Sequence, residues 1–250
     1  MDAPHYKMKR TQLGSKQHPK LSSLIDKAVF DYNMIEDGDA ILIGASGGKD
    51  STALVEYFAN RARRPRCNFS FKAVHIQSDF APPFSPKIIS LFDSWHVPFA
   101  IIDVDVRARI KQHHKMNCWW CSMQRRTELV QYAIAHKFNK IALGHHLDDI
   151  LETLLMNMLN KSELSTMPPR FAYNKYPVTI VRPLCYASVE ALVRHAHENG
   201  WSSCTCTCNY QDNSGRKEAR AALQAITCGN EAKKMHLFES LKNIQNAYLP

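Results

Sequence analysis

The stretch AILIGASGGKDS, residues 40–51, decides the fold class of this chain. Its apolar half, AILIGA, predicts a short strand that is buried on both faces. A polar turn with two adjacent glycines follows, and a helix is predicted over residues 50–64. A strand, a Gly-rich turn and a helix in this order form a phosphate cradle, because glycines let backbone N–H groups face an anion and the helix N-terminus favours negative charge. A Gly-rich turn that binds nothing is the alternative.

The side chains of residues 46–51 have predicted roles in this cradle. The hydroxyl groups of Ser46 and Ser51 can donate hydrogen bonds. Lys49 supplies a positive charge, and Asp50 can hold Mg²⁺ or a water. The turn is not a Walker loop, because the spacing differs and Asp50 stands where a Walker loop has Ser or Thr. The predicted binding residues are Ser46, Gly47, Gly48, Lys49, Asp50 and Ser51, of which Lys49 and Asp50 are the predicted catalytic residues.

Apolar runs and helical patterns alternate along nearly the whole chain. Strands are predicted at residues 72–77, 99–106, 140–144 and 178–184, and helices at 21–32, 88–96, 118–138, 148–161 and 188–197. This alternation predicts an α/β fold with a doubly wound, mostly parallel sheet and a helical C-terminal part, and a ligand crevice beyond the carboxyl ends of the strands. We expect a flexible basic arm at residues 1–20, one α/β domain at 21–200, and a cysteine-containing helical extension at 201–250 packed on that domain.

A second polar segment follows the predicted strand at residues 140–144. The sequence GHHLDD places Gly144, His145, His146, Asp148 and Asp149 at a strand end and a helix start. The two carboxylates can cap the helix or hold Mg²⁺ on a nucleotide. The two histidines are weaker candidates for metal ligands, because adjacent residues of a strand point to opposite faces.

The eight cysteines fall into two groups and three single positions. Cys118 and Cys121 form a CxxC motif at a helix start, which is typical of a redox pair or of half a metal site. A CxxC and one distant cysteine supply three thiolates, which can hold an iron–sulfur cluster with one open iron, whereas four thiolates form a closed zinc site. The distant candidates are Cys204, Cys206 and Cys208; Cys67, Cys185 and Cys228 are expected to be small buried residues.

The string SGGKDS resembles the pyrophosphate loop of the PP-loop ATP-pyrophosphatases. Four later strings look like the successive motifs of the tRNA 2-thiocytidine synthetases: CWWCSMQRR at 118–126, KIALGHHLDDILETLLMNM at 140–158, TMPPR at 166–170 and VRPL at 181–184. The similarity covers residues 21–220. It implies an enzyme that binds ATP and Mg²⁺, adenylates the cytidine at position 32 of the tRNA anticodon loop, and transfers sulfur from a [4Fe-4S] cluster to give 2-thiocytidine, with release of AMP and pyrophosphate.

The resemblance also implies which residues form the site. Gly144 and Asp149 would contact the nucleotide, with Asp148 as a further candidate, and the end of the strand at 72–77 would lie beside the adenine. Two of three cluster ligands would be Cys118 and Cys121.

The third cluster ligand depends on how the family motif is aligned with this chain. Alignment on CNYQ selects Cys208. The family usually has a CxxC where this chain has CTCTC, so Cys204 and Cys206 stay open as alternatives.

The charge of the chain suits a polyanionic partner, since the formal net charge is +9 and the isoelectric point is near 9.1. With the resemblance, the expected partners are tRNA and a cysteine desulfurase or another sulfur donor, and a homodimer is possible. A cytoplasmic location is expected, because the sequence has neither a secretory signal pattern nor a run of about 18 apolar residues. Candidate contacts to RNA phosphates are Arg125, Arg126, Arg170 (in a predicted loop), Arg216, Lys217 and Arg220.

Three alternative functions are open from the sequence. The first is another PP-loop tRNA-modifying enzyme, such as a thiouridine synthetase or a lysidine-type synthetase, although the lysidine type needs no CxxC. The second is a nucleotide- or metal-responsive RNA-binding protein. The third is a zinc-stabilised PP-loop protein.

Overall fold

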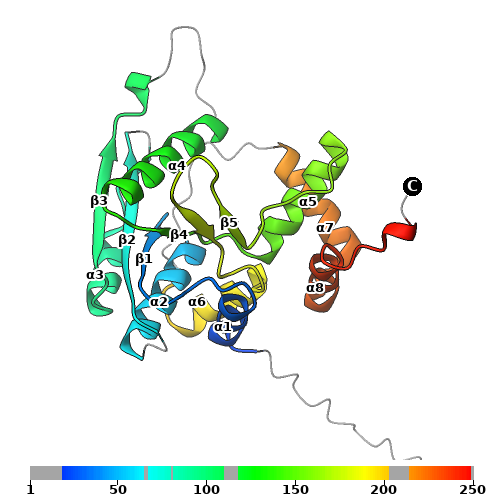
Figure 1. Ribbon diagram of the computed structural model, residues 1–250, viewed down its shortest axis with the longest axis horizontal. Coiled ribbons are helices and arrows are strands. Elements are labelled where there is room, and N and C mark those ends of the chain that lie inside the picture. The colour runs from blue at the N-terminus through cyan, green and yellow to red at the C-terminus, as the bar shows by residue number, and fades with distance from the viewer. Residues whose placement is uncertain (1–18, 65–66, 80, 110–117, 203–213, 249–250) are drawn as a thin grey trace, which may run out of the picture.

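The computed structural model describes residues 19–64, 67–79, 81–109, 118–202 and 214–248. Within these residues one sheet has the strand order β3-β2-β1-β4-β6-β5 (Figure 1). All neighbouring strands are parallel except β5 and β6, which confirms the mostly parallel α/β fold. The strands are β1 Asp39–Gly44, β2 Phe69–Ser78, β3 Phe99–Val104, β4 Lys140–Ala142, β5 Arg170–Ala172 and β6 Thr179–Val181.

Helices connect these strands and continue to the C-terminal part. They are α1 Leu21–Asp31, α2 Lys49–Arg63, α3 Pro86–Ser94, α4 Cys118–Ala135, α5 Leu147–Lys161, α6 Val189–Glu198, α7 Ser214–Thr227 and α8 Glu231–Ser240. Figure 1 shows α5, α7 and α8 grouped at one end of the molecule, where α5 contacts both of the others. None of the helices in the described ranges has the length and apolarity needed to span a membrane.

The central strand β1 is buried on both faces, as its apolar sequence predicts. The side chains of Ile41 and Ile43 belong to one core cluster and that of Leu42 to the other, and all three are fully buried. Successive side chains of a strand point to opposite faces, so a strand covered on both sides reads as a continuous apolar run.

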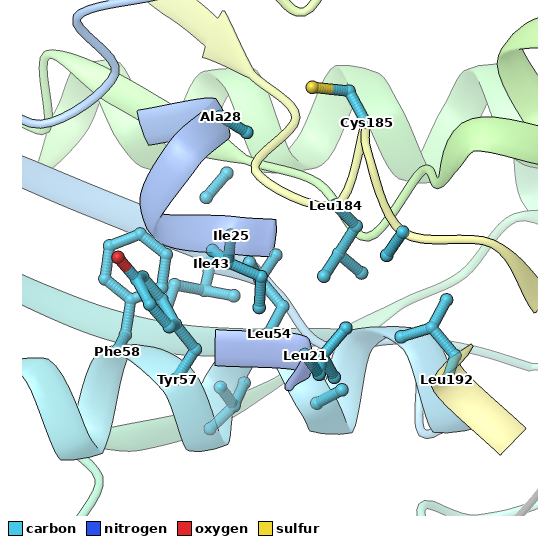
Figure 2. Packing of buried hydrophobic residues seen from close by; sticks show 14 of the residues in the cluster. Leu21, Ile25, Ala28, Ile43, Leu54, Tyr57, Phe58, Leu184, Cys185 and Leu192 are labelled. Carbon is cyan, nitrogen blue, oxygen red and sulfur yellow. The ribbon is translucent and has the colours of Figure 1, made fainter. Parts of the chain in front are cut away.

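Helices cover the two faces of the sheet unequally. On one face Ile25 of α1 and Leu54 and Phe58 of α2 pack against Ile43 (Figure 2). On the other face the apolar stripe of α4, at residues 129, 130 and 133, packs against the second cluster. The main core therefore lies between the sheet and helices α1, α2 and α3, together with the buried sides of α5 and α6.

The strand order reverses direction between β1 and β4. The chain runs outward from β1 to β3 on one side, and it returns to place β4, β6 and β5 on the other. The segments that leave β1 and β4 therefore lie next to each other at the carboxyl edge, which is where open α/β sheets bind ligands. These are residues 45–48 and 143–146.

The structure corrects two local predictions. Arg170 lies in the edge strand β5 and not in a loop. All three residues of β5 are exposed and two prolines precede them, so no alternation of apolar and polar residues marks this strand. Cys228 is exposed, contrary to the expected burial, because it follows the last turn of α7 with a positive φ of 50°. Cys185 is fully buried as expected, and Cys67 is partly buried.

Candidate nucleotide site

The loop after β1 is shaped by its first glycine. Gly47 has a φ of +82°, a conformation that side chains with a Cβ rarely adopt. A Cβ at this position would also lie 3.1 Å from the ring of Phe84. Gly48 is the N-cap residue of α2, so the first backbone N–H groups of the helix, which have no partner within it, face the turn. This is the geometry of a cradle for a phosphate group.

The serine hydroxyls hold the loop in shape. Ser51 is buried, and its Oγ accepts a hydrogen bond from the backbone N–H of Ser46 at 3.1 Å and donates one to the carbonyl of Gly48 at 3.0 Å. The Oγ atoms of Ser46 and Ser51 are 3.0 Å apart. The hydrogen bonds of the Ser51 hydroxyl group lie inside the loop. Its role as a direct donor to the anion stays a prediction.

Lys49 and Asp50 form an ion pair at the start of α2. Lys49 Nζ lies 2.9 Å from Asp50 Oδ1, and both side chains are about three-quarters buried, with exposed fractions of 23% and 27%. The pair places one cationic and one anionic group at the mouth of the cradle. A phosphate and a metal cation are the ligands that complement such a pair.

The segment after β4 is packed directly on the loop. A Cβ on Gly144 would lie 3.0 Å from the backbone nitrogen of Ser51 and 3.2 Å from the backbone carbon of Asp50. Because only glycine leaves room for this contact, the spacing between the two segments depends on the absence of a side chain at residue 144. The structure thus brings Gly144 together with the predicted loop residues.

His146 is the N-cap of α5. Its Nδ1 accepts from the backbone N–H of Asp149 at 3.4 Å, and Asp149 Oδ2 accepts from the backbone N–H of His146 at 3.2 Å. The Nε2 atom of His146 lies 3.4 Å from Asp149 Oδ2 and 4.0 Å from Asp50 Oδ2. The two carboxylates therefore face the same imidazole from opposite walls of the crevice.

Asp148 points away from the crevice and into an internal network. Its Oδ1 accepts from Lys234 Nζ of α8 at 2.5 Å, and its Oδ2 accepts from the backbone N–H of Val189 at 2.8 Å. Lys234, with 2% of its surface exposed, also donates to Glu190 at 2.9 Å. Burial alone would lower the pKa of Lys234, but these two carboxylates raise it above its ordinary value. Asp148 thus joins α5 to α6 and α8, and does not face a nucleotide.

Helix α7 lies along α5 through two arginines. Arg220 donates from Nε to Glu152 Oε1 at 2.7 Å and from Nη2 to Oε2 at 3.4 Å, and this hydrogen bonding raises the pKa of Arg220. Arg216 Nη1 lies 3.7 Å from Asp149 Oδ1. Arg220 is therefore bound to a buried carboxylate, and its predicted contact to an RNA phosphate stays a prediction.

The cysteine predictions are only partly covered by the structure. Cys118 and Cys121 lie in the first turn of α4. The predicted third ligand, Cys208, and its alternatives Cys204 and Cys206 lie outside the described residues. Within the described part of the chain, no three acidic, histidine or cysteine side chains gather around a common point that could hold a metal ion.

Two residues near the crevice were missed by the sequence reasoning as candidates for anion binding. Arg182, just after β6, is half-buried, and its Nη1 donates to the carbonyl of Pro168 at 2.5 Å. Burial, and then the neighbouring Arg126, lower its pKa to about 10. His145 lies beyond β4, next to Gly144. The signal for Arg182 was present in the sequence, because an arginine interrupts the otherwise apolar strand VTIVRPL.

Comparison with known proteins identifies the family of this chain. The family model of the PP-loop domain matches residues 16–226. The tRNA-cytidine(32) 2-sulfurtransferase of Methylobacillus flagellatus is 34% identical over an alignment of 251 positions, which covers 98% of this chain and 82% of the relative. The enzyme of the same name from Nitrosospira multiformis is 33% identical over 94% of this chain and 80% of its own length.

A solved structure has a similar fold. The U34-tRNA thiolase NcsA from Methanococcus maripaludis, solved with its [4Fe-4S] cluster, matches with a TM-score of 0.73 over 92% of this chain and 81% of its own. The sequence identity is 18%, so this similarity establishes the fold.

Proposed function

The chain belongs to the PP-loop family of tRNA-cytidine(32) 2-sulfurtransferases, and we propose that it is an ATP-dependent enzyme that converts a tRNA cytidine to 2-thiocytidine. The observation that carries this proposal is the preformed loop at residues 46–51, closed by Gly144 at the point where the strand order reverses. Such a loop suits the pyrophosphate end of ATP. The relatives supply the acceptor, the cytidine at position 32.

The first step is adenylation of the base. The O2 atom of the cytidine attacks the α-phosphorus of ATP, the bond between the α and β phosphates breaks, and pyrophosphate leaves. The backbone N–H groups of residues 47–51 and the ammonium group of Lys49 stabilise the negative charge on the departing pyrophosphate. Binding both substrates in one crevice supplies their relative orientation.

In the second step a sulfur nucleophile at the oxidation level of sulfide attacks C2 of the adenylated base. The bond between C2 and O2 breaks, and AMP leaves with that oxygen. The ring then carries a 2-thio group, and no external oxidant or reductant is consumed.

Mg²⁺ would be held by Asp50 and Asp149. Their carboxylates both face His146, with Oδ2 atoms 4.0 and 3.4 Å from its Nε2. Mg²⁺ is usually bound by one or two carboxylates together with substrate phosphates, so this pair suits the ion once ATP is present. Release of AMP should then stop when the divalent cation is chelated.

A [4Fe-4S] cluster would be held by Cys118, Cys121 and one of Cys204, Cys206 and Cys208, with Cys208 the first choice. The thiolate side chain is the right donor for iron–sulfur clusters, and three such ligands leave one iron open to present sulfide. The likeness to a thiolase that carries this cluster supports the assignment.

The setting follows from the same relationship. The substrate would be tRNA, consistent with the net charge of +9. A cysteine desulfurase or another donor would supply the sulfur, in the cytoplasm where tRNA is modified. A homodimer stays a prediction from the sequence.

The test is reconstitution under anaerobic conditions with ATP, Mg²⁺, sulfide and an unmodified tRNA transcript. The wild-type protein should release AMP and form 2-thiocytidine, measured by nucleoside mass spectrometry. The variant Lys49→Ala should release no AMP above background. The variant Cys118→Ala should bind ATP normally and form no 2-thiocytidine. Formation of a different thionucleoside would overturn the choice of base, and thiolation by Cys118→Ala at the normal rate would overturn the role of the cluster.

A further inference from the structure

Four basic side chains from four separate segments converge at the carboxyl edge of the sheet. They are Arg126 of α4, Arg182 after β6, Arg216 of α7 and His145 after β4. Burial is the main cause that lowers the pKa of His145 to about 4. The carboxylate of Asp149 opposes this shift, and the charges of the three arginines add to it. The backbone N–H of Leu143 donates to the carbonyl of Val181 at 3.0 Å, so His145 and Arg182 follow two strand ends that lie side by side.

Several polar atoms in this group are buried without a hydrogen-bond partner in the described part of the chain. They are the Nε atoms of Arg182 and Arg216 and the Nδ1 atom of His145. Native proteins pair most buried polar groups, so each of these atoms calls for a ligand or water. Their common location at one edge of the sheet indicates a shared ligand.

Arg182 is held in place for such a ligand. Its backbone N–H donates to the carbonyl of Pro169 at 2.8 Å, and its Nη1 donates to the carbonyl of Pro168 at 2.5 Å. The carbonyl of Pro168 thus fixes one side of the guanidinium group, and Nε stays unpaired. A fixed, half-buried guanidinium with an unpaired donor is suited to an oxyanion.

Arg126 lies at the crevice end of the buried stripe of α4. It precedes the buried residues Leu129 and Val130 by three and four positions, so it projects from the same side of the helix. Arg126 itself is exposed. Its guanidinium is accessible to a ligand that enters from solvent.

Among the residues that the structure describes, positive charge outweighs negative charge around His145. Asp149 is the carboxylate that acts on His145, and it already accepts from the backbone of His146 and faces Arg216. In the described part of the chain, the one carboxylate that acts on His145 is set against the charges of three guanidinium groups. Partly buried like charges of this kind favour binding of an anion.

The position of the carboxylates separates this anion from ATP. Asp50 and Asp149 both face His146. Asp50 is paired with Lys49 of the loop, whereas Asp149 faces Arg216. The phosphates of ATP belong to the Lys49 side. The arginines lie on the other side. In the sequence, the cysteines proposed as cluster ligands precede Arg126 of α4 and Arg216 of α7, so the acceptor nucleotide is expected to enter here.

We infer that Arg126, Arg182 and His145 form a subsite for a backbone phosphodiester of the tRNA, next to the nucleotide that is modified. The cytidine base itself is uncharged, so a phosphodiester is the anion that it brings into the crevice. This inference rests on the proposed function for the identity of the RNA. It adds a residue, Arg182, that fixes the position of the acceptor strand without touching the reacting atoms.

The experiment measures binding of an unmodified tRNA transcript to the full chain at several salt concentrations. The variants are Arg126→Gln and Arg182→Gln, and the matched control is Arg64→Gln. Arg64 is exposed and is the C-cap residue of α2, whereas the loop at residues 46–48 lies at the N-terminus of that helix. Each test variant should bind tRNA about 5- to 30-fold more weakly, and the slope of log Kd against log salt should fall by about one per lost phosphate contact. The control should match the wild type.

Binding of a non-hydrolysable ATP analogue is measured in parallel. It should be unchanged in all three variants. If the test variants lose affinity for the analogue and keep their affinity for tRNA, the anion is a phosphate of ATP and the inference is wrong. If neither affinity differs from the control, the arginines are structural and the inference is also wrong.

Two further comparisons keep the result interpretable. Arg126→Gln changes an exposed side chain, so it tests the subsite even if Arg182→Gln fails to fold, and Arg182→Lys, which keeps the charge, should retain more affinity than Arg182→Gln. Binding is measured without turnover, so arginine-dependent tRNA binding by a protein that forms no 2-thiocytidine would overturn the proposed function and leave the subsite standing. A wild-type protein that does not bind tRNA would overturn both.

Discussion

Replacing Gly144 by alanine tests whether the two walls of the nucleotide site depend on each other. The added Cβ would lie 3.0 Å from Ser51 N and 3.2 Å from Asp50 C and Ser51 Cα, whereas ordinary contacts of a Cβ are 3.4–4 Å. The neighbours are backbone atoms in the first turn of α2, so no side chain can rotate away. The loop or the strand end must move by a few tenths of an ångström.

The size of the effect follows from this contact. Overpacking of a well-packed site costs about 1–3 kcal/mol. If the loop moves to relieve the contact, the same strain opposes its return to the conformation that binds the phosphates. Each 1.4 kcal/mol is a factor of ten in affinity, so ATP should bind roughly 5- to 150-fold more weakly.

Isothermal titration calorimetry with a non-hydrolysable ATP analogue measures this loss. Gly215→Ala is the matched control, because the nearest atom to its added Cβ is Met156 Cε at 3.8 Å and the residue lies in helix α7. The control should bind ATP normally and gain up to about 1 kcal/mol of stability from the better helix propensity of alanine. An ATP affinity of Gly144→Ala equal to that of the wild type would refute the close packing of the two walls.

Three other properties should follow from the buried groups. Lys234→Met should lower the free energy of unfolding in urea by about 3–5 kcal/mol, because Asp148 is left with an unpaired buried charge. Adding Asp148→Asn should recover part of the loss. Strictly additive effects of the two substitutions would contradict the pairing of Lys234 with Asp148. The folded-state pKa of His145 is about 4, below its ordinary 6.5. The unfolded state therefore takes up the proton first, and the free energy of unfolding should fall as the pH drops from 6.5 toward 4. His145→Asn should weaken this pH dependence, and an unchanged pH dependence in the variant would contradict the burial of His145. Cys228 is exposed and should react with a thiol reagent in the folded protein. Burial raises the pKa of Cys185 to about 12, so this thiol should react only on unfolding. Peptide mass spectrometry measures the labelling, and rapid labelling of Cys185 in the folded protein would contradict its buried position.

The central part of the fold could be predicted because its signals are local. The run AILIGA forms a strand that is buried on both faces, and its continuous apolar sequence predicts this burial. The turn at residues 46–51 could be predicted because glycine readily adopts a positive φ, and Gly47 has one in the structure. The start of α5 was also visible, since carboxylates near a helix N-terminus are favoured there.

The long-range pairs could not be predicted in the same way. Asp148 and Lys234 are 86 residues apart, and Glu152 and Arg220 are 68 apart. Nothing in the local pattern states that Asp148 turns inward while Asp149, the next residue, faces the crevice.

The basic group at the crevice was hidden for a similar reason. Its members come from four segments that only the sheet topology and the packing of α7 on α5 bring together. The edge strand β5 was missed because its exposed residues carry no alternation.

The most direct test of the proposed function is nucleoside mass spectrometry of bulk tRNA from cells with and without this gene. The proposed function predicts that 2-thiocytidine disappears in the cells that lack the gene, that other thionucleosides remain, and that the wild-type gene restores it while a gene encoding Lys49→Ala does not. An unchanged level of 2-thiocytidine in cells that lack the gene, or its restoration by the Lys49→Ala variant, would contradict the proposal.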